Sequence, residues 1–234
     1  MYKTELHIHT GTVSKCGYVS SRDIVKLYKD LGFETIFITD HINKPSFDLR
    51  SEAKETWEEK VDMFFDGYIA AKRAGDECGL RVLFGAEICF KEPKGNVNDY
   101  LVYGIDRDFL IGYEYLHDGT VEDFYKYAKA HGAIVIQAHP YRETPNYGNC
   151  YPTPEFVDGF EACNGHVRHK NNNDKAAALV EELGCLRTAG SDFHRLGDEG
   201  RAYIETEEPI TSAEDLIKVL REGSAVLAVK SLCD

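Results

Sequence analysis

Side chains able to bind metal ions recur at the carboxyl ends of the strands that this sequence predicts. Short apolar strands are expected at residues 4–9, 35–39, 81–86, 133–137 and 186–189, with helices between several of them. A repeated strand–helix order predicts a parallel α/β sheet. Because chemistry gathers at the carboxyl ends of the strands in a TIM-like barrel, we expect that architecture. A doubly wound open sheet is the alternative, but its glycine-rich phosphate turn is missing from the sequence.

The first of these strand ends carries the sequence Leu6-His7-Ile8-His9-Thr10. Side chains two residues apart on a strand point to the same face, so we expect His7 and His9 to project together. Two imidazoles side by side form a pair of nitrogen ligands for a divalent metal ion. Taken alone, the pair is also consistent with two polar residues half-buried on an edge strand.

Later strand ends supply enough further ligands for more than one ion. The predicted metal ligands are His7, His9, His41, Glu87, His139, Asp192 and His194. Seven ligands exceed one tetrahedral site, so we expect two or three divalent ions that share a bridging carboxylate, either Glu87 or Asp192. Mixed imidazole and carboxylate donors favour Zn, Mn or Fe over Ca or Mg. Each motif alone also fits a turn or a surface residue, and only their common placement makes the prediction specific.

Five short motifs occur in order along nearly the whole chain: Leu6-His7-Ile8-His9-Thr10, Thr39-Asp40-His41, Gly85-Ala86-Glu87, Ala138-His139-Pro140 and Gly190-Ser191-Asp192-Phe193-His194. Together they resemble the motifs of the PHP (polymerase and histidinol phosphatase) superfamily of metal-dependent phosphoesterases. This resemblance implies a distorted (β/α)7 barrel with a bi- or trinuclear metal centre. It also implies three groups of ligands: His7 and His9 with Glu87 and Asp192, His41 with His194, and His139 with Glu87.

Two positions depart from the fullest version of this family pattern. Cys16 stands where relatives commonly carry Asp or His in the loop after the His-x-His motif. A thiolate binds Zn or Fe, but an ordinary packed cysteine is an equal alternative. Asp99 stands where many relatives have a metal-binding histidine, and it either binds a hard ion or caps a turn. The number of ions is therefore open.

Three further residues are candidates for a direct part in catalysis. Arg142 follows His139 by three residues and Arg195 follows His194 directly, so either guanidinium could grip a phosphate in bidentate fashion. Both are equally well explained as surface arginines. We expect Asp40 to orient a ligand or to take up a proton rather than to bind metal directly.

Composition narrows the class of protein. The 234 residues suffice for one large α/β domain, which we expect to span residues 1–234. The net charge of −13 makes a non-specific grip on long nucleic acid unfavourable, although a small phosphorylated substrate is compatible with it. No apolar run reaches membrane-spanning length, and because the first residues enter a strand pattern directly we expect no secretion signal. Seven scattered cysteines without a C-x-x-C pair suit reduced thiols in the cytoplasm.

The sequence and the family resemblance lead to one main functional prediction and three alternatives. We expect a metal-dependent phosphomonoesterase acting on a small phosphorylated metabolite, of the histidinol phosphate or nucleotide class, by metal-activated water. A phosphodiesterase or short-oligonucleotide exonuclease, and a non-catalytic metal-binding PHP module, remain open. An amidohydrolase-type enzyme is less well supported, since no strand end offers the lysine that such enzymes carbamylate. Neither the oligomeric state nor the native metal follows from the sequence.

Overall fold

Seven strands form the wall of a nearly closed barrel. The computed structural model describes residues 1–47, 55–90, 98–144 and 148–230. In spatial order the wall consists of β10 (Leu186–Gly190), β9 (Gly159–Asn164), β6 (Ile134–Gln137), β5 (Asp99–Tyr103), β4 (Arg81–Cys89), β2 (Thr35–Ile38) and β1 (Tyr2–Glu5). Its two ends meet through a parallel bridge between Ile8 and Phe193, where the N–H of His9 donates to the carbonyl of Phe193 at 2.9 Å. The predicted distorted TIM-like barrel is confirmed.

The expectation of an all-parallel sheet was wrong at two places. Strand β5 runs antiparallel to both of its neighbours, β4 and β6, because the nine residues between Cys89 and Asp99 are fewer than the dozen or more that a parallel crossover needs. The sequence of residues 91–96, with Pro93 and Gly95, predicts a turn between these two strands, and this turn lies outside the described residues. Strands β11 (Ala202–Thr206) and β12 (Val226–Val229) extend the sheet beyond β1 as an antiparallel pair. A short strand β3 (His41–Ile42) pairs with the far end of β4.

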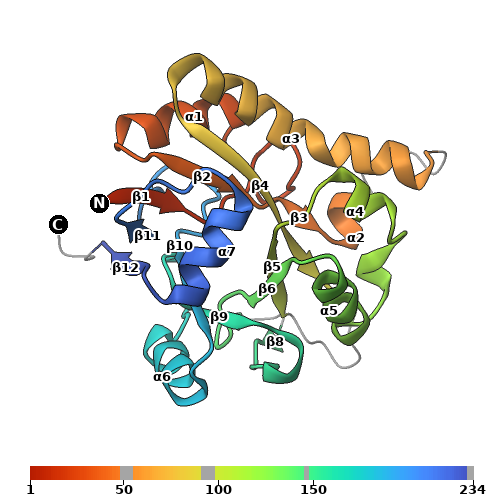
Figure 1. Ribbon diagram of the computed structural model, residues 1–234. Helices are drawn as coiled ribbons and strands as arrows, with labels where there is room; N and C mark the ends of the chain where they lie inside the picture. The colour runs from red at the N-terminus through yellow and green to blue at the C-terminus, as the bar shows by residue number, and fades with distance from the viewer. Residues whose placement is uncertain (48–54, 91–97, 145–147, 231–234) are drawn as a thin grey trace.

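Helices pack around the outside of this wall (Figure 1). The longer ones are α1 (Ser21–Asp30), α3 (Trp57–Cys78), α5 (Val121–Ala130), α6 (Asn173–Leu183) and α7 (Ala213–Glu222), and the short ones are α2 (Lys44–Phe47), α4 (Arg107–Ile111), η1 (Leu116–Asp118) and η2 (Pro154–Phe156). Four of them begin with a capped first turn: the side chains of Ser20, Thr56, Thr120 and Ser212 each accept the N–H of the residue three positions later. No helix in the described ranges is long and apolar enough to cross a membrane.

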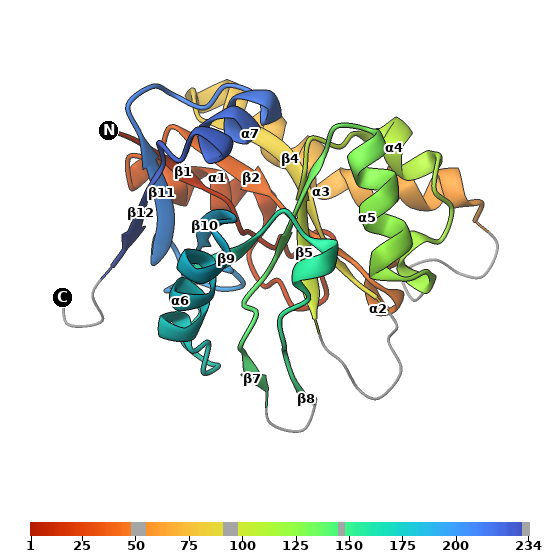
Figure 2. The ribbon, with the colours of Figure 1, turned by 60° about the horizontal axis from the view of Figure 1, so that its bottom comes forward.

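The sequence of residues 141–155, with three prolines, predicts a long loop after β6, but part of this connection is regular. Two short strands, β7 (Glu143–Thr144) and β8 (Gly148–Asn149), pair in antiparallel fashion within it. Figure 2 shows this hairpin reaching out beyond the carboxyl ends of the barrel strands. Helix α4 and strand β3 were also not predicted, since both are too short to show a clear hydrophobic period.

Apolar side chains fill the barrel below the carboxyl ends of its strands. Leu6, Phe37, Leu101, Tyr103 and Ile136 are fully buried in one cluster. The hydroxyl of Tyr103 donates to the carbonyl of Leu6 at 2.9 Å and so ties β5 to the first strand across the interior. This packing closes the barrel from beneath, and the polar residues that follow the strands are therefore gathered at its mouth.

Candidate metal centre

All seven predicted ligands meet at the mouth of the barrel. His7 and His9 lie beyond the end of β1, which is shorter than predicted, and His139, Asp192 and His194 follow β6 and β10. His41 and Glu87 lie on the paired strands β3 and β4. His7, His9, Glu87, His139 and Asp192 are at most 2% exposed, and the side chains of His41 and His194 are 15% and 12% exposed. Residues up to 187 positions apart thus form one buried polar cluster.

Glu87 lies at the centre of this cluster. Its Oε1 is 3.2 Å from Nε2 of His7 and 3.3 Å from Nε2 of His139. Its Oε2 is 3.0 Å from Nε2 of His9 and 3.1 Å from Nδ1 of His41. One carboxylate thus faces four imidazoles, two at each oxygen, which is the arrangement expected of a bridging ligand.

Asp192 supplies a second carboxylate on the opposite strand of the barrel. Its Oδ1 lies 3.5 Å from Nε2 of His7, 3.4 Å from Nε2 of His9 and 3.3 Å from Nδ1 of His194. Asp192 has a φ of 51° and His139 a φ of 30°, in a region that residues other than glycine rarely adopt. Such strained positions persist where the surroundings enforce them, and they cluster at functional sites.

The close contacts of this cluster demand positive charge. Burial alone would lower the pKa of His9, but Asp192 and Glu87 outweigh it and raise the pKa to about 9. Burial and Arg142 would lower the pKa of His139, but its contacts with Cys150 and then Glu87 raise it to about 10. Burial likewise opposes ionisation of Glu87 and Asp192, yet His7 lowers the pKa of Glu87 and Arg142 lowers that of Asp192, in both cases well below the usual range. Without a metal ion, the carboxylates are therefore neutralised by protons on the imidazoles and by Arg142.

The donor atoms fit divalent metal ions better than they fit a hydrogen-bond network. Nε2 of His7 and Nε2 of His9 lie 3.1 Å apart. Oε1 of Glu87, Nδ1 of His9 and Nδ1 of His41 are buried without a well-aligned hydrogen bond from the described residues. Buried polar atoms that lack a partner are rare and often mark an ion. Four groups hold donors within 4.8 Å of one another: His7, His9 and Glu87; His9, Cys16, His41 and His194; Glu87, Asp99 and His139; and His166, Asp192 and His194.

Glu161, within β9, contacts two of the predicted ligands. Its Oε1 lies 2.9 Å from Nδ1 of His7, and its Oε2 accepts the N–H of His139 at 3.0 Å and the amide of Asn164 at 2.8 Å. A carboxylate on the far nitrogen of a ligating histidine fixes its tautomer and strengthens it as a ligand. No motif of the sequence singles out Glu161, because its partners are brought to it only by the folded barrel.

The three predicted catalytic residues lie in different surroundings. Asp40 accepts hydrogen bonds of 2.7 Å from the N–H and Oγ1 of Thr10 and from Oγ of Ser14, which in turn accepts the N–H of His41 at 3.0 Å. It therefore positions the loop and His41, in keeping with the orienting role expected for it. Arg142 is buried, and it donates to Asp192, Asn164 and Asn171.

Arg195 is exposed at the rim of the site and stacks on Tyr18, with 5.0 Å between the guanidinium carbon and the ring centroid. Among the described residues, no carboxylate pairs with it.

The two departures from the family pattern both lie at the site. Asp99 is 3.7 Å from Nε2 of His139, and burial, together with Glu87, raises its pKa to about 7. Burial also raises the pKa of the Cys16 thiol above its usual range, with a further contribution from Glu87 and Asp192.

An open cavity of roughly 360 Å³ leads from the cluster to the surface. Besides several predicted ligands and the three residues Cys16, Arg142 and Arg195, it is lined by Tyr18, His166, Arg168 and His169. Arg168 makes a bidentate pair with Asp198 at 2.6 and 2.7 Å, and the rings of His166 and His169 stack with centroids 5.0 Å apart. Tyr18 and Arg168 lie in loops without a motif, so the sequence offers no signal for them. His166 and His169 follow the strand predicted at residues 160–163, and from the sequence they are either substrate contacts or solvated loop residues.

Comparisons with known proteins agree with this architecture. A family model described as PHP-associated matches residues 170–225. A two-domain protein from Bacteroides vulgatus that contains a predicted PHP-like metal-dependent phosphoesterase is similar over 97% of this chain and 64% of its own, with 15% identity and a TM-score of 0.68. The chain therefore shares its fold with this PHP-like protein.

Two further solved structures share this PHP fold. A protein from Bifidobacterium adolescentis that is assigned as a metal-dependent phosphoesterase matches over 93% of this chain and 95% of its own, with 17% identity and a TM-score of 0.57. The lesion-specific endonuclease Q of Pyrococcus furiosus matches over 97% of this chain and 57% of its own, with 15% identity and a TM-score of 0.60. The chain thus spans less than two thirds of some of these proteins. Comparison with the curated proteins finds no match.

Proposed function

We propose that this chain is a metal-dependent phosphoesterase, and specifically a phosphomonoesterase that acts on a small phosphorylated metabolite. The observation that carries the proposal is the buried cluster of five imidazoles around Glu87 and Asp192 at the carboxyl ends of the barrel strands. Neither packing nor a hydrogen-bond network explains why so many titratable groups share one buried site. The PHP fold supports the same reaction class.

The proposed ligands are those predicted from the sequence. His7, His9, Glu87 and Asp192 would hold one ion, His41 and His194 a second, and His139 with Glu87 and Asp99 a third. Bound divalent ions of the Zn, Mn or Fe type would polarise the phosphoryl group and lower the pKa of water. Glu161 holds the imidazole of His7 in the orientation that ligation needs.

The substrate phosphate would be held at the rim by Arg195. Three arginines line the cavity, but Arg142 and Arg168 already pair with Asp192 and Asp198. Arg195 is the one whose guanidinium has no carboxylate partner among the described residues, and it is fixed by its stacking on Tyr18. We expect Arg195→Met to raise KM for a phosphomonoester more than it lowers kcat, because the ground-state phosphate would lose its cationic partner.

The size of the cavity supports a small substrate. Its volume of about 360 Å³ lies near the lower end of the range of ligand pockets. The net charge of −13 also disfavours a long polyanion that must be gripped along its backbone. Histidinol phosphate and nucleotides both remain candidate substrates. A cytoplasmic location is part of the proposal, and the six described cysteines are all free of disulfides, as it would require.

A phosphodiester substrate is the second candidate, and the similarity to endonuclease Q favours it. The prediction that long nucleic acid is not a partner therefore stands without confirmation. Purified protein loaded with Mn, Zn or Fe would be assayed against p-nitrophenyl phosphate and bis-p-nitrophenyl phosphate, and against duplex DNA with a lesion. Turnover of the monoester alone, abolished in a His7→Ala/His9→Ala double variant, is the expected result. Turnover of only the diester or DNA would overturn the monoesterase proposal, and no turnover despite bound metal would indicate a non-catalytic PHP module.

A further inference from the structure

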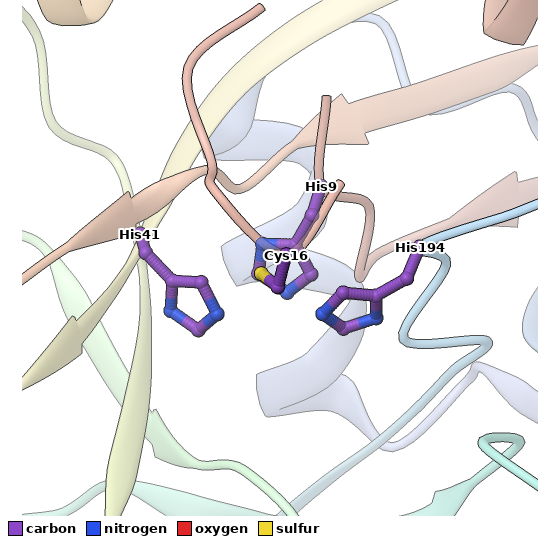
Figure 3. Close-up of side chains that lie close together, drawn as sticks. All are labelled: His9, Cys16, His41 and His194. Atoms are coloured by element: carbon purple, nitrogen blue, oxygen red, sulfur yellow. The ribbon is translucent and has the colours of Figure 1, made fainter. Parts of the chain in front are cut away.

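Cys16 lies where three imidazoles converge. Its sulfur and one ring nitrogen each from His9, His41 and His194 all lie within 4.8 Å of one another. Figure 3 shows the three rings and the thiol around a common space, with His41 and His194 on either side of Cys16. The ring centroids of His41 and His194 are 4.2 and 4.5 Å from that of His9. The sulfur and the nitrogens of His41 and His194 give three donors of the kind that zinc prefers, and His9, a proposed ligand of the first ion, lies beside them.

The loop that carries Cys16 is fastened on both sides of the thiol. Before it, Ser14 donates to Asp40 and accepts the N–H of His41. After it, the N–H of Tyr18 donates to the carbonyl of His194 at 2.8 Å. Cys16 is thus tied by its own neighbours in the chain to the two histidines that it faces. A ligand held in this way loses little conformational entropy when it binds an ion.

Close backbone packing holds the same loop against the His-x-His segment. A Cβ atom on Gly17 would lie 2.5 Å from the carbonyl oxygen of Thr10, so only glycine lets the two backbones approach this closely. Cys16 itself is only partly buried and belongs to none of the apolar clusters of the described core. Its position is therefore set by the loop and the site rather than by core packing.

We propose that Cys16, as a thiolate, binds the ion assigned above to His41 and His194, and that this sulfur ligand makes the position selective for Zn or Fe(II) over Mn or Mg. The proposal rests on the metal centre proposed above but not on the reaction assigned to it. Binding transfers the thiol proton to solvent as the sulfur–metal bond forms. The remaining groups, His7 with Glu87 and His139 with Glu87 and Asp99, offer oxygen donors and accept harder ions. The centre would thus hold two chemically distinct kinds of ion.

Cobalt(II) reports a thiolate ligand directly, since a sulfur–cobalt bond gives a near-ultraviolet charge-transfer band that nitrogen and oxygen ligands do not. Metal-free protein would be titrated with Co²⁺ alone, and both this band and the visible d–d bands recorded. The variants are Cys16→Ser, Cys16→Asp and Cys150→Ser. Cys150 is included because its sulfur lies 3.8 Å from Nδ1 of His139 and is therefore also near the proposed centre. Cys78→Ser, at an exposed cysteine on α3, is the matched control.

We expect the charge-transfer band in the wild type, in Cys78→Ser and in Cys150→Ser, and its loss in both Cys16 variants. Cys16→Ser should also bind Zn²⁺ at least roughly tenfold more weakly. Removing a residue that only hydrogen-bonds a ligand already costs about that much, and Cys16 is proposed to be a ligand itself. Cys16→Asp should still bind an ion but prefer Mn²⁺, which also shows that the variant is folded. Cobalt d–d bands without a sulfur band, or a band lost only in Cys150→Ser, would overturn the role of Cys16 and leave the phosphoesterase proposal standing. If the wild type binds no Co²⁺, both proposals fail.

Discussion

Replacing Arg142 by Met separates the role that the structure gives this residue from the role that its sequence position suggested. In the structure, Arg142 is the guanidinium that neutralises buried Asp192, and it also donates to Asn164 and Asn171. Asp192 is 1% exposed, so the substitution leaves a charged carboxylate in the interior without its strongest partner. Breaking a buried pair in this way costs about 3–5 kcal/mol.

The loss of stability caused by Arg142→Met should depend on whether metal is bound. In chelator, protonated His7 and His9 still face Oδ1 of Asp192, so we place the cost near the lower end, at about 3 kcal/mol. For a chain of this size that corresponds to a fall in Tm of about 6–12 °C. A divalent ion bound beside Asp192 would replace the lost charge, so the cost with saturating Zn²⁺ or Mn²⁺ should drop to about 1–2 kcal/mol. The metal-induced stabilisation is therefore larger in the variant than in the wild type.

Urea unfolding of both proteins, in EDTA and with saturating metal, measures all four free energies of unfolding. Arg195→Met is the matched control because Arg195 is exposed and pairs with no carboxylate among the described residues, so its stability should stay within about 0.5 kcal/mol of the wild type. A loss below about 1 kcal/mol for Arg142→Met in EDTA, unchanged by metal, would refute the reasoning. A raised KM with unaltered stability would instead support the phosphate grip first predicted for Arg142.

Three further predictions follow from the geometry of the site. Glu161→Gln should lower metal affinity by about 10–100-fold, because His7 loses its orienting carboxylate. A competition titration with a chromophoric chelator measures this affinity. Glu143→Gln, at an exposed pair with Lys170, is the control and should leave the affinity unchanged. Gly190→Ala would place a Cβ 2.5 Å from Cβ of His7, so it should destabilise the protein by about 1–3 kcal/mol in urea and also weaken metal binding. The pKa values of His9 and His139 are raised from 6.5 to about 9 and about 10, so in EDTA their contribution to stability should be complete below about pH 6.5 and be lost as the pH rises through 9–10. A thermal unfolding series in EDTA that shows stability constant or rising between pH 7 and 10 would contradict this linkage.

The sequence predicted the site more completely than it predicted the sheet. Each predicted ligand comes at or just after a short apolar strand, and the carboxyl ends of barrel strands must share one mouth, so local pattern was enough to bring His7 and Asp192 together. The reversed direction of β5 was not predicted, because strand direction depends on the connection between β4 and β5 and not on the pattern within either strand.

Contacts between side chains could not be predicted from the sequence, for a different reason. The pair of His7 and Glu161 joins residues 154 positions apart, and it exists only because β9 and β10 bring Glu161 beside the first strand at one particular register. A shift of one residue would turn Glu161 to the other face of the strand. The pairing of Arg142 with Asp192 likewise depends on how the segment after His139 folds back. Such contacts follow from the assembled barrel and not from any single segment.

Protons and metal ions are alternative occupants of the same cluster. Glu87 and Asp192 are held in the ionised form in a buried site, and in the absence of metal it is the protonated imidazoles and Arg142 that offset their charge. An imidazolium cannot bind a cation, so an ion that uses His7, His9 or His139 must displace a proton. Burial lowers the pKa of His41 and His194 to about 3, so these two rings are already neutral. The barrel can therefore fold before metal is present, since protons on part of the cluster hold its carboxylates in place until ions replace them.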